Sequence, residues 1–160
     1  MAITTKRPRD LSEYIDLVSD LQKRRDTELW FRGIGKLNYK LEPSLYRHKE
    51  KTDLVKMQQL EKNIIVRFKE RAIPFHERSF TDEWDLLFFM QHHGVPTRLL
   101  DWSENPFIGL YFAIASAVRN RRQKLASSCV VWILDPAMWN NCALSKQGYD
   151  RGILTSSDDQ

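Results

Sequence analysis

Apolar residues recur at helical spacing near the start of the chain and again after residue 52. The first run follows Asp10, which can cap a helix, and has Glu13 in its first turn; its apolar positions are Leu11, Tyr14, Ile15, Val18 and Leu21. A longer helix begins at Thr52 or Asp53 and ends before Pro74, because proline cannot continue it. The pattern therefore predicts two amphipathic helices in the first half of the chain.

Two further helices flank a polar connection. Thr81 can cap the segment DEWDLLFFMQHH, and Gly94 is a natural stop for it. Asn105 followed by Pro106 is typical of an N-cap with proline at the first helical position, and this pair opens the segment FIGLYFAIASAV. That segment, residues 107–118, is apolar nearly all round, so we expect it to be the buried centre of the fold.

Two segments have the composition of β-strands. The first covers about residues 28–32, and the second, SCVVWILDP, is a β-rich run of the fully buried kind. After the first strand, GIGKLNYKLEPSLYRHKE predicts a long ordered loop that Leu41, Leu45 and Tyr46 pin to the core. After Asp135 we expect a loop, a short strand and a polar end. Two strands make a poor sheet, so either weak strands lie in the loops or the natural domain continues past Gln160; the second is favoured.

These elements predict an α+β fold in a single domain over residues 1–160. We expect the buried central helix to pack on a small mixed sheet, with outer helices covering both. The core should span about residues 28–135, followed by a truncated or irregular C-terminal part.

Composition limits the class of protein. Hydrophobic residues make up 42% and charged residues 29%, which is typical of a globular chain. Lys and Arg outnumber Asp and Glu by 25 to 21, and the excess is local, at residues 6–9, 23–25 and 119–124. Such clusters are either solvated faces or a nucleic-acid footprint.

The cysteines and the apolar stretches indicate a compartment. Cys129 and Cys142 form no C-x-x-C pair and fit a reduced protein, with a buried thiol expected at Cys129. No apolar stretch is long enough to span a membrane, and the N-terminal segment lacks a hydrophobic signal core. We therefore expect a cytoplasmic protein without a membrane partner.

The connection between the last two predicted helices carries an unusual number of functional groups: His92, His93, Thr97, Arg98, Asp101, Ser103 and Asn105. Each also has a structural interpretation. Arg98 and Asp101 can pair across the turn, Ser103 or Asn105 can cap the following helix, and a histidine can end the preceding one.

The motifs WFRG, LEPSLYR and FMQHHGVPTRLLDWSENPFIGLYFA resemble the FRG domain, a family of bacteria and phages named for its Phe-Arg-Gly signature. The resemblance covers about residues 30–135, and the last block is long enough to be specific. Members usually carry a further β segment with Gln and Gly near its end, of which SKQGYDRGILT is a candidate trace. The resemblance implies a role in conflict between phage and bacterium.

More distantly, the chain is similar to ADP-ribosyltransferases of the arginine–serine–glutamate type, which implies an incomplete domain of that fold and NAD as the cofactor. Arg32 would hold the diphosphate bidentately, and Gly33 would let the backbone approach it. Ser103 or Thr97 would orient the ribose. The chain has no glutamate after Glu104, so the catalytic acid of that family would be missing, replaced, or supplied from outside the chain; the candidate replacements are Asp150, Asp158 and Asp159.

The leading prediction is an NAD-handling, ADP-ribosyltransferase-like effector. Its predicted catalytic residues are Arg32, His92, His93, Asp101 and Ser103, and its predicted cofactor-binding residues are Arg32, Gly33, Thr97, Arg98 and Trp102. The alternative is a non-enzymatic module that binds nucleic acid or a protein through the basic segments. A third prediction is that a partner protein or a downstream segment completes the site.

No metal is expected from the sequence. The available ligands, His76, His92, His93 and Cys129, lack the paired spacing of a zinc site.

Overall fold

The computed structural model describes residues 3–24, 28–49, 51–72, 80, 82–117, 128–147 and 153. It divides into two compact units. Unit 1 comprises Met1–Tyr39 and Trp102–Gln160, and unit 2 comprises Lys40–Asp101. The described helices and the strand pair confirm an α+β fold. The prediction of one domain over residues 1–160 stays a prediction.

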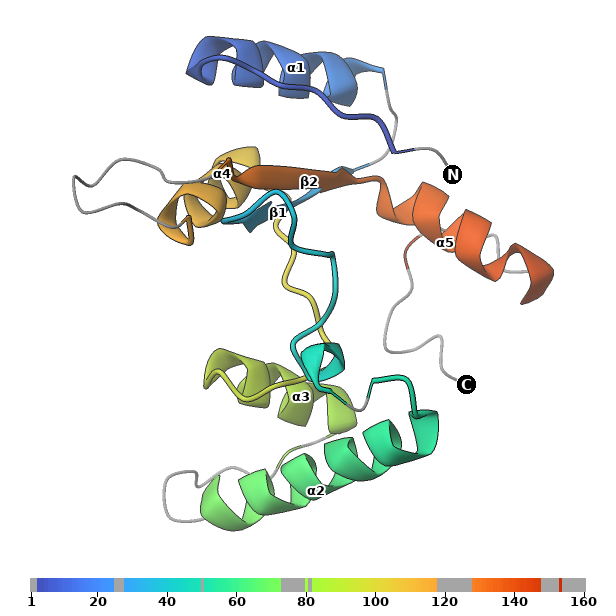
Figure 1. Ribbon diagram of the computed structural model, residues 1–160. Coiled ribbons are helices and arrows are strands. Elements are labelled where there is room, and N and C mark those ends of the chain that lie inside the picture. The colour runs from blue at the N-terminus through green and yellow to red at the C-terminus, as the bar shows by residue number, and fades with distance from the viewer. Residues whose placement is uncertain are drawn as a thin grey trace. The chain divides into compact units, whose positions relative to one another are not determined.

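The sheet of unit 1 is formed by β1 (Trp30–Ile34) and β2 (Val130–Leu134) (Figure 1). The two strands pair antiparallel, with Phe31 opposite Ile133. On the other edge of β1, Phe31 N–H donates to the Ser103 carbonyl at 2.7 Å and Ser103 N–H donates to the Phe31 carbonyl at 2.9 Å. The polar connection therefore forms an isolated β-bridge to β1 at Ser103. Every pairing in the described part is antiparallel, so the prediction of a mixed sheet is wrong there.

One face of this sheet packs against two helices, α1 (Leu11–Lys23) and α4 (Pro106–Ala115). Phe31 is 1% exposed and belongs to a cluster with Tyr14 and Val18 of α1; Leu110, Val131 and Ile133 pack against the same cluster. Gly33 allows α4 to approach β1 closely, since a Cβ at this position would lie 2.0 Å from the Gly109 carbonyl oxygen. Phe31 and Gly33 alternate with Arg32 along the strand, so Arg32 belongs to the opposite face.

Helix α4 is buried on one side only. Gly109 and Ala113 face the sheet and are buried, as is Ala117 just beyond the helix. Apart from Leu110, its large side chains are 38% to 66% exposed: Phe107, Ile108, Tyr111, Phe112 and Ile114. The expectation that this apolar segment is buried all round is therefore wrong, because small residues bring one side against β1 and leave the bulky ones on the other.

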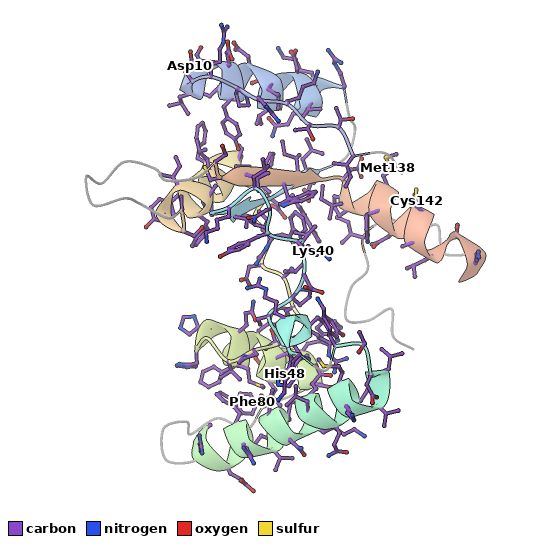
Figure 2. The ribbon with its side chains drawn as sticks, viewed as in Figure 1. Asp10, Lys40, His48, Phe80, Met138 and Cys142 are labelled. Atoms are coloured by element: carbon purple, nitrogen blue, oxygen red, sulfur yellow. The ribbon has the colours of Figure 1, made fainter. Side chains whose placement is uncertain are left out.

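The N-terminus of α1 confirms its predicted cap. Asp10 lies at the start of the helix (Figure 2), and its Oδ1 accepts from Glu13 N–H at 2.9 Å. The Glu13 carboxylate accepts in turn from the backbone N–H of Arg9 at 2.8 Å and pairs with the Arg9 guanidinium. Those hydrogen bonds lower the pKa of Glu13 because they stabilise its ionised form.

The chain after β2 differs from the expectation. A helix, α5 (Pro136–Leu144), follows where a loop and a short strand were predicted. Asp135 caps it by accepting from Met138 N–H at 2.8 Å, and Pro136 stands at its first position. A short 3-10 turn, η3 (Ser145–Gln147), continues from it. Strand β2 is half-buried along its length rather than fully buried, and Cys129 before it is half-buried as well.

In unit 2, α2 (Leu54–Ala72) packs against α3 (Glu83–His92). The buried residues of α3 are Leu86, Leu87 and Met90, and the side chains that pack on them include Ile64, Ile65 and Phe68 of α2. Phe80 lies against the same cluster (Figure 2).

The ends of these two helices test the predicted signals. Lys56 N–H donates to Asp53 Oδ1 at 3.1 Å, in line with a helix that opens at Asp53. Helix α3 is capped by Asp82, whose Oδ1 accepts from Asp85 N–H at 2.7 Å, so the prediction of Thr81 as the cap is wrong by one residue. Pro74 and Thr81 themselves lie outside the described residues.

Gly94 adopts φ 72° just past α3 and confirms the predicted stop. The predicted ordered loop contains a 3-10 turn, η1 (Leu45–Arg47), in which Leu45 is 2% exposed. Across the described ranges, no helix combines the length and the hydropathy needed to cross a membrane.

Candidate functional site

Arg32 lies at the centre of β1, on the sheet face opposite Phe31. In the register of the two strands its cross-strand partner is Trp132 of β2. On the other edge of β1, the pairing of Phe31 with Ser103 brings Trp102 level with Arg32, since antiparallel positions run in opposite directions from a bridge. Trp102, Arg32 and Trp132 therefore form one row across three chain segments, with directly paired side chains on the same face. We call this the Arg32 row.

The Arg32 row is partly shielded from solvent. All three of its residues are half-buried, and the Arg32 Nε and the Trp132 Nε1 are buried at the level of the atom. Within the described part of the chain, the Trp132 indole N–H has no hydrogen-bond acceptor. A buried donor without an acceptor costs about 1–3 kcal/mol, and because this nitrogen is enclosed, a ligand oxygen would recover that energy only after the neighbouring side chains move.

The row combines a permanent cation with two large aromatic rings. A guanidinium binds phosphate or carboxylate oxygens through a planar fork of donors, and indole rings stack on planar heterocycles. This arrangement suits a ligand that has an anionic group next to an aromatic base.

Gly33 follows Arg32 in β1 and lies on the opposite face of the sheet, against α4. The space that its side chain would occupy is filled by the α4 backbone, with the Gly109 oxygen 2.0 Å and the Ala113 nitrogen 2.2 Å from an ideal Cβ. Its absent side chain is thus explained by packing against α4. Its predicted contact with a cofactor stays a prediction.

Ser103 lies on the Phe31 side of the pairing, away from Arg32. Its Oγ accepts from Asn105 N–H at 3.1 Å, and Asn105 Oδ1 accepts from Phe107 N–H at 2.9 Å. Asn105 is therefore the cap of α4, as one of the two sequence alternatives predicted. Ser103 orders the turn that leads into that cap.

In unit 2, Thr97 is 1% exposed and fully engaged in hydrogen bonds. Its hydroxyl donates to Gln91 Oε1 and accepts from Leu99 N–H, while its backbone N–H donates to Ser44 Oγ at 3.1 Å. Its carbonyl accepts from Leu45 N–H at 3.1 Å. Through Ser44 and Leu45, Thr97 thus holds the first part of the polar connection against η1.

Arg98 joins α2 and α3. Its Nε donates to Glu61 of α2 at 2.7 Å, and its Nη2 donates to Glu83 of α3 at 3.1 Å. Asp101, the partner that the sequence suggested for Arg98, accepts from Gln91 Nε2 at 3.1 Å at each of its oxygens.

The two histidines are exposed at the C-terminal end of α3, which agrees with the helix-end alternative for them. Their ring centroids lie 5.2 Å apart, and the His93 ring also contacts Phe89 edge-on at 4.6 Å. In the part of the chain that is described, no three His, Cys, Asp or Glu side chains gather as a metal site requires.

The predicted site residues divide between the units. Unit 1 holds Arg32, Gly33, Trp102 and Ser103, and unit 2 holds His92, His93, Thr97, Arg98 and Asp101. The structure places the residues of unit 1 in or beside the Arg32 row. A cleft shared by the residues of both units stays a prediction. The basic segment at residues 119–124, His76, and the candidate acids Asp150, Asp158 and Asp159 lie outside the described residues.

Trp132 was not singled out from the sequence. Its run, VVWIL, has the composition of a core strand, and its position opposite Arg32 follows only from the strand register. A tryptophan within an otherwise aliphatic strand was the one signal available.

Neither a curated protein nor a solved structure matches the chain. The family model of the FRG domain matches residues 27–122, which is more than half of the 160 residues. The matched range contains Arg32 and Trp102 and the whole connection from His92 to Asn105. The chain therefore belongs to the FRG domain family.

Proposed function

We propose that this FRG domain binds a nucleotide at the Arg32 row, with NAD as the leading ligand. The observation that carries the proposal is the row itself: a half-buried guanidinium with a tryptophan on each side, one of which has a buried N–H without an acceptor in the described part.

Each side chain of the row would contact one part of a dinucleotide. Arg32 would hold the diphosphate, because two parallel N–H donors match two phosphate oxygens. Trp102, which directly precedes the Ser103 bridge, would stack on the base. Trp132 would donate its indole N–H to a phosphate or ribose oxygen once the side chains that enclose this nitrogen move.

ADP-ribosyl transfer is the reaction we propose for the bound NAD, in line with the distant resemblance to the arginine–serine–glutamate transferases. This reaction needs a carboxylate to stabilise the positive charge that develops on the ribose, and the chain has no glutamate after Glu104. An aspartate of the C-terminal segment or a residue of a partner protein would supply it. The setting that we propose, conflict between phage and bacterium, comes from the family resemblance alone.

Titration calorimetry of the full chain with NAD tests the binding step. Arg32→Ala should abolish measurable binding while the circular dichroism spectrum stays that of the wild type. Arg9→Ala is the matched control, because it removes the same charge from an exposed arginine of the same unit.

Tryptophan fluorescence separates the roles of the rings. The chain has five tryptophans, and bound NAD should quench emission in the wild type and in Trp139→Phe, whose ring is 51% exposed on α5. Trp102→Leu should lose most of the quenching and weaken binding about tenfold, in line with about 1–3 kcal/mol for one stacked base. A folded wild-type protein that binds neither NAD nor ADP-ribose would overturn the proposal.

A further inference from the structure

Two glycines determine which side chains share a face of β1. An ideal Cβ on Gly33 meets the backbone of α4, and one on Gly35 lies 2.1 Å from the carbonyl oxygen of Ser116, which ends α4. Both glycines therefore face α4. Because successive residues of an extended chain alternate between the two faces, Arg32 and Lys36 belong to the opposite face. Lys36 thus adds a cation to the face that carries the Arg32 row.

Two backbone hydrogen bonds hold the segment around Lys36 at the end of the sheet. Leu37 N–H donates to the Ser128 carbonyl at 2.9 Å, so the segment after β1 stays attached to the segment before β2. Tyr39 N–H donates to the Lys36 carbonyl at 3.1 Å and closes a tight turn. All these residues belong to unit 1, as do those of the Arg32 row. Lys36 therefore has a defined backbone position relative to Arg32.

The separation of the two cations suits a diphosphate. Lys36 follows Arg32 by four residues of extended chain, which puts their Cα atoms at most about 13 Å apart. Each side chain is about 6 Å long from its Cα to its charged end. The two charged ends can therefore meet above Ile34, which is half-buried between them on the same face. The guanidinium would hold one phosphate bidentately, and the ammonium would hold the next.

The Lys36 ammonium lies 5.2 Å from the centre of the exposed Tyr39 ring. A cation–π contact at an exposed site favours the bound arrangement by only about two- to fivefold. A hydrogen bond to a charged group favours it by about ten- to hundredfold. A phosphate within reach therefore draws the ammonium away from the ring.

We propose that Arg32 and Lys36 clamp the diphosphate of the ligand, which makes the site selective for nucleotides that carry a diphosphate over those that carry one phosphate. The inference rests on the function proposed for the Arg32 row and narrows its class of ligand. Arg32 engages both classes, because a single phosphate already fills its fork of donors. Lys36 engages only the second phosphate, so the two residues have separable effects on binding.

Titration calorimetry of the full chain with ADP-ribose and with AMP tests the clamp. At pH 7.5 the phosphate of AMP carries about two negative charges, as does the diphosphate of ADP-ribose, so net charge does not distinguish the two ligands. The wild type should bind ADP-ribose about tenfold more tightly than AMP, or better. Lys36→Gln should weaken ADP-ribose binding about ten- to hundredfold and change AMP binding by less than about threefold.

Three further variants serve as controls. Lys36→Arg should keep the wild-type preference, because it keeps the cation. Lys23→Gln should also keep it, since it removes the same charge from an exposed position at the end of α1. Arg32→Ala should weaken the binding of both ligands. Retained AMP binding shows that the site of the Lys36→Gln protein is folded.

The clamp is overturned if the wild type binds ADP-ribose and AMP equally well. It is equally overturned if Lys36→Gln weakens both ligands to the same extent, or weakens neither. In each of these cases a nucleotide still binds, so the function proposed for the Arg32 row stands. A folded wild type that binds neither ligand refutes the clamp and that function together.

Discussion

The closest approach in unit 1, between β1 and α4, makes Gly33→Ala the most informative single substitution. An alanine Cβ at position 33 would lie 2.0 Å from the Gly109 oxygen, 2.2 Å from the Ala113 nitrogen and 2.9 Å from the Phe112 carbonyl carbon. Ordinary contacts to a Cβ begin near 3.4 Å, so α4 would have to withdraw by more than about 1 Å. All three obstacles are backbone atoms, which no side-chain rotation can move aside.

The expected loss is large because this withdrawal also opens the core beside Phe31. Inserting a methylene into a well-packed core costs about 1–3 kcal/mol, and an obstacle made of helix backbone puts Gly33→Ala at about 3–5 kcal/mol. That is a substantial part of the 5–15 kcal/mol that typically separates folded from unfolded domains.

Two other glycines calibrate the result. Gly109→Ala meets Phe31 Cβ at 2.9 Å and Val131 Cγ1 at 3.3 Å, and part of its cost is offset by the better helix propensity of alanine, about 1 kcal/mol. Its net loss should stay below about 2 kcal/mol. Gly94→Ala has no atom within 4 Å, and its cost of about 1 kcal/mol comes from the positive φ of 72°.

Urea unfolding followed by circular dichroism and by tryptophan fluorescence ranks the three variants. The expected order of destabilisation is Gly33→Ala well ahead of Gly109→Ala and Gly94→Ala. A Gly33→Ala protein within 1 kcal/mol of the wild type would refute the close packing of β1 on α4.

Two further substitutions test buried polar groups. The Tyr14 hydroxyl donates to the Pro106 carbonyl at 2.8 Å, and burial raises the pKa of Tyr14 to about 12 from 10.0. As the pH rises, the unfolded chain therefore loses this proton before the folded chain does. The contribution of Tyr14 to the free energy of unfolding is complete below pH 10 and is lost between about pH 10 and about pH 12. Tyr14→Phe should flatten that part of the plot of urea midpoint against pH. Thr97→Val should cost about 1–3 kcal/mol in urea unfolding, because it leaves the Gln91 oxygen and the Leu99 N–H without their hydroxyl partner. A Thr97→Val protein as stable as the wild type would mean that other groups satisfy both.

Local signals in the sequence predicted the helix ends well. Asp10 and Asn105 cap helices as predicted, and Gly94 ends one as predicted. Such signals are readable from the sequence because caps and stops depend on neighbours within one turn. The Asp135–Pro136 pair is the same N-cap and proline signal as Asn105–Pro106. It is not accompanied by an amphipathic pattern, because the apolar residues of α5 lie all round the helix and form no single stripe.

The periodicity of apolar residues could not predict which surfaces of the elements pack against one another. An apolar run such as 107–118 indicates a helix but does not tell which of its sides is covered, and here glycine and alanine decide it by their size. The neighbours of Arg32 depend on strand register across about a hundred residues, so Trp132 could not be assigned to the site from its sequence position. Trp102 was identified because it lies in a connection that is rich in polar groups.

The pairing of β1 with β2 has a consequence for how the chain folds during synthesis. Ile34 pairs with Val130 and Trp30 with Leu134, so β1 leaves the ribosome well before its partner strand exists. Unit 2 is a continuous stretch, Lys40–Asp101, and can complete its helix packing in that interval. Closing β1 on β2 must then be a late, high-contact-order step, and the edge of β1 that pairs with β2 stays open until it occurs.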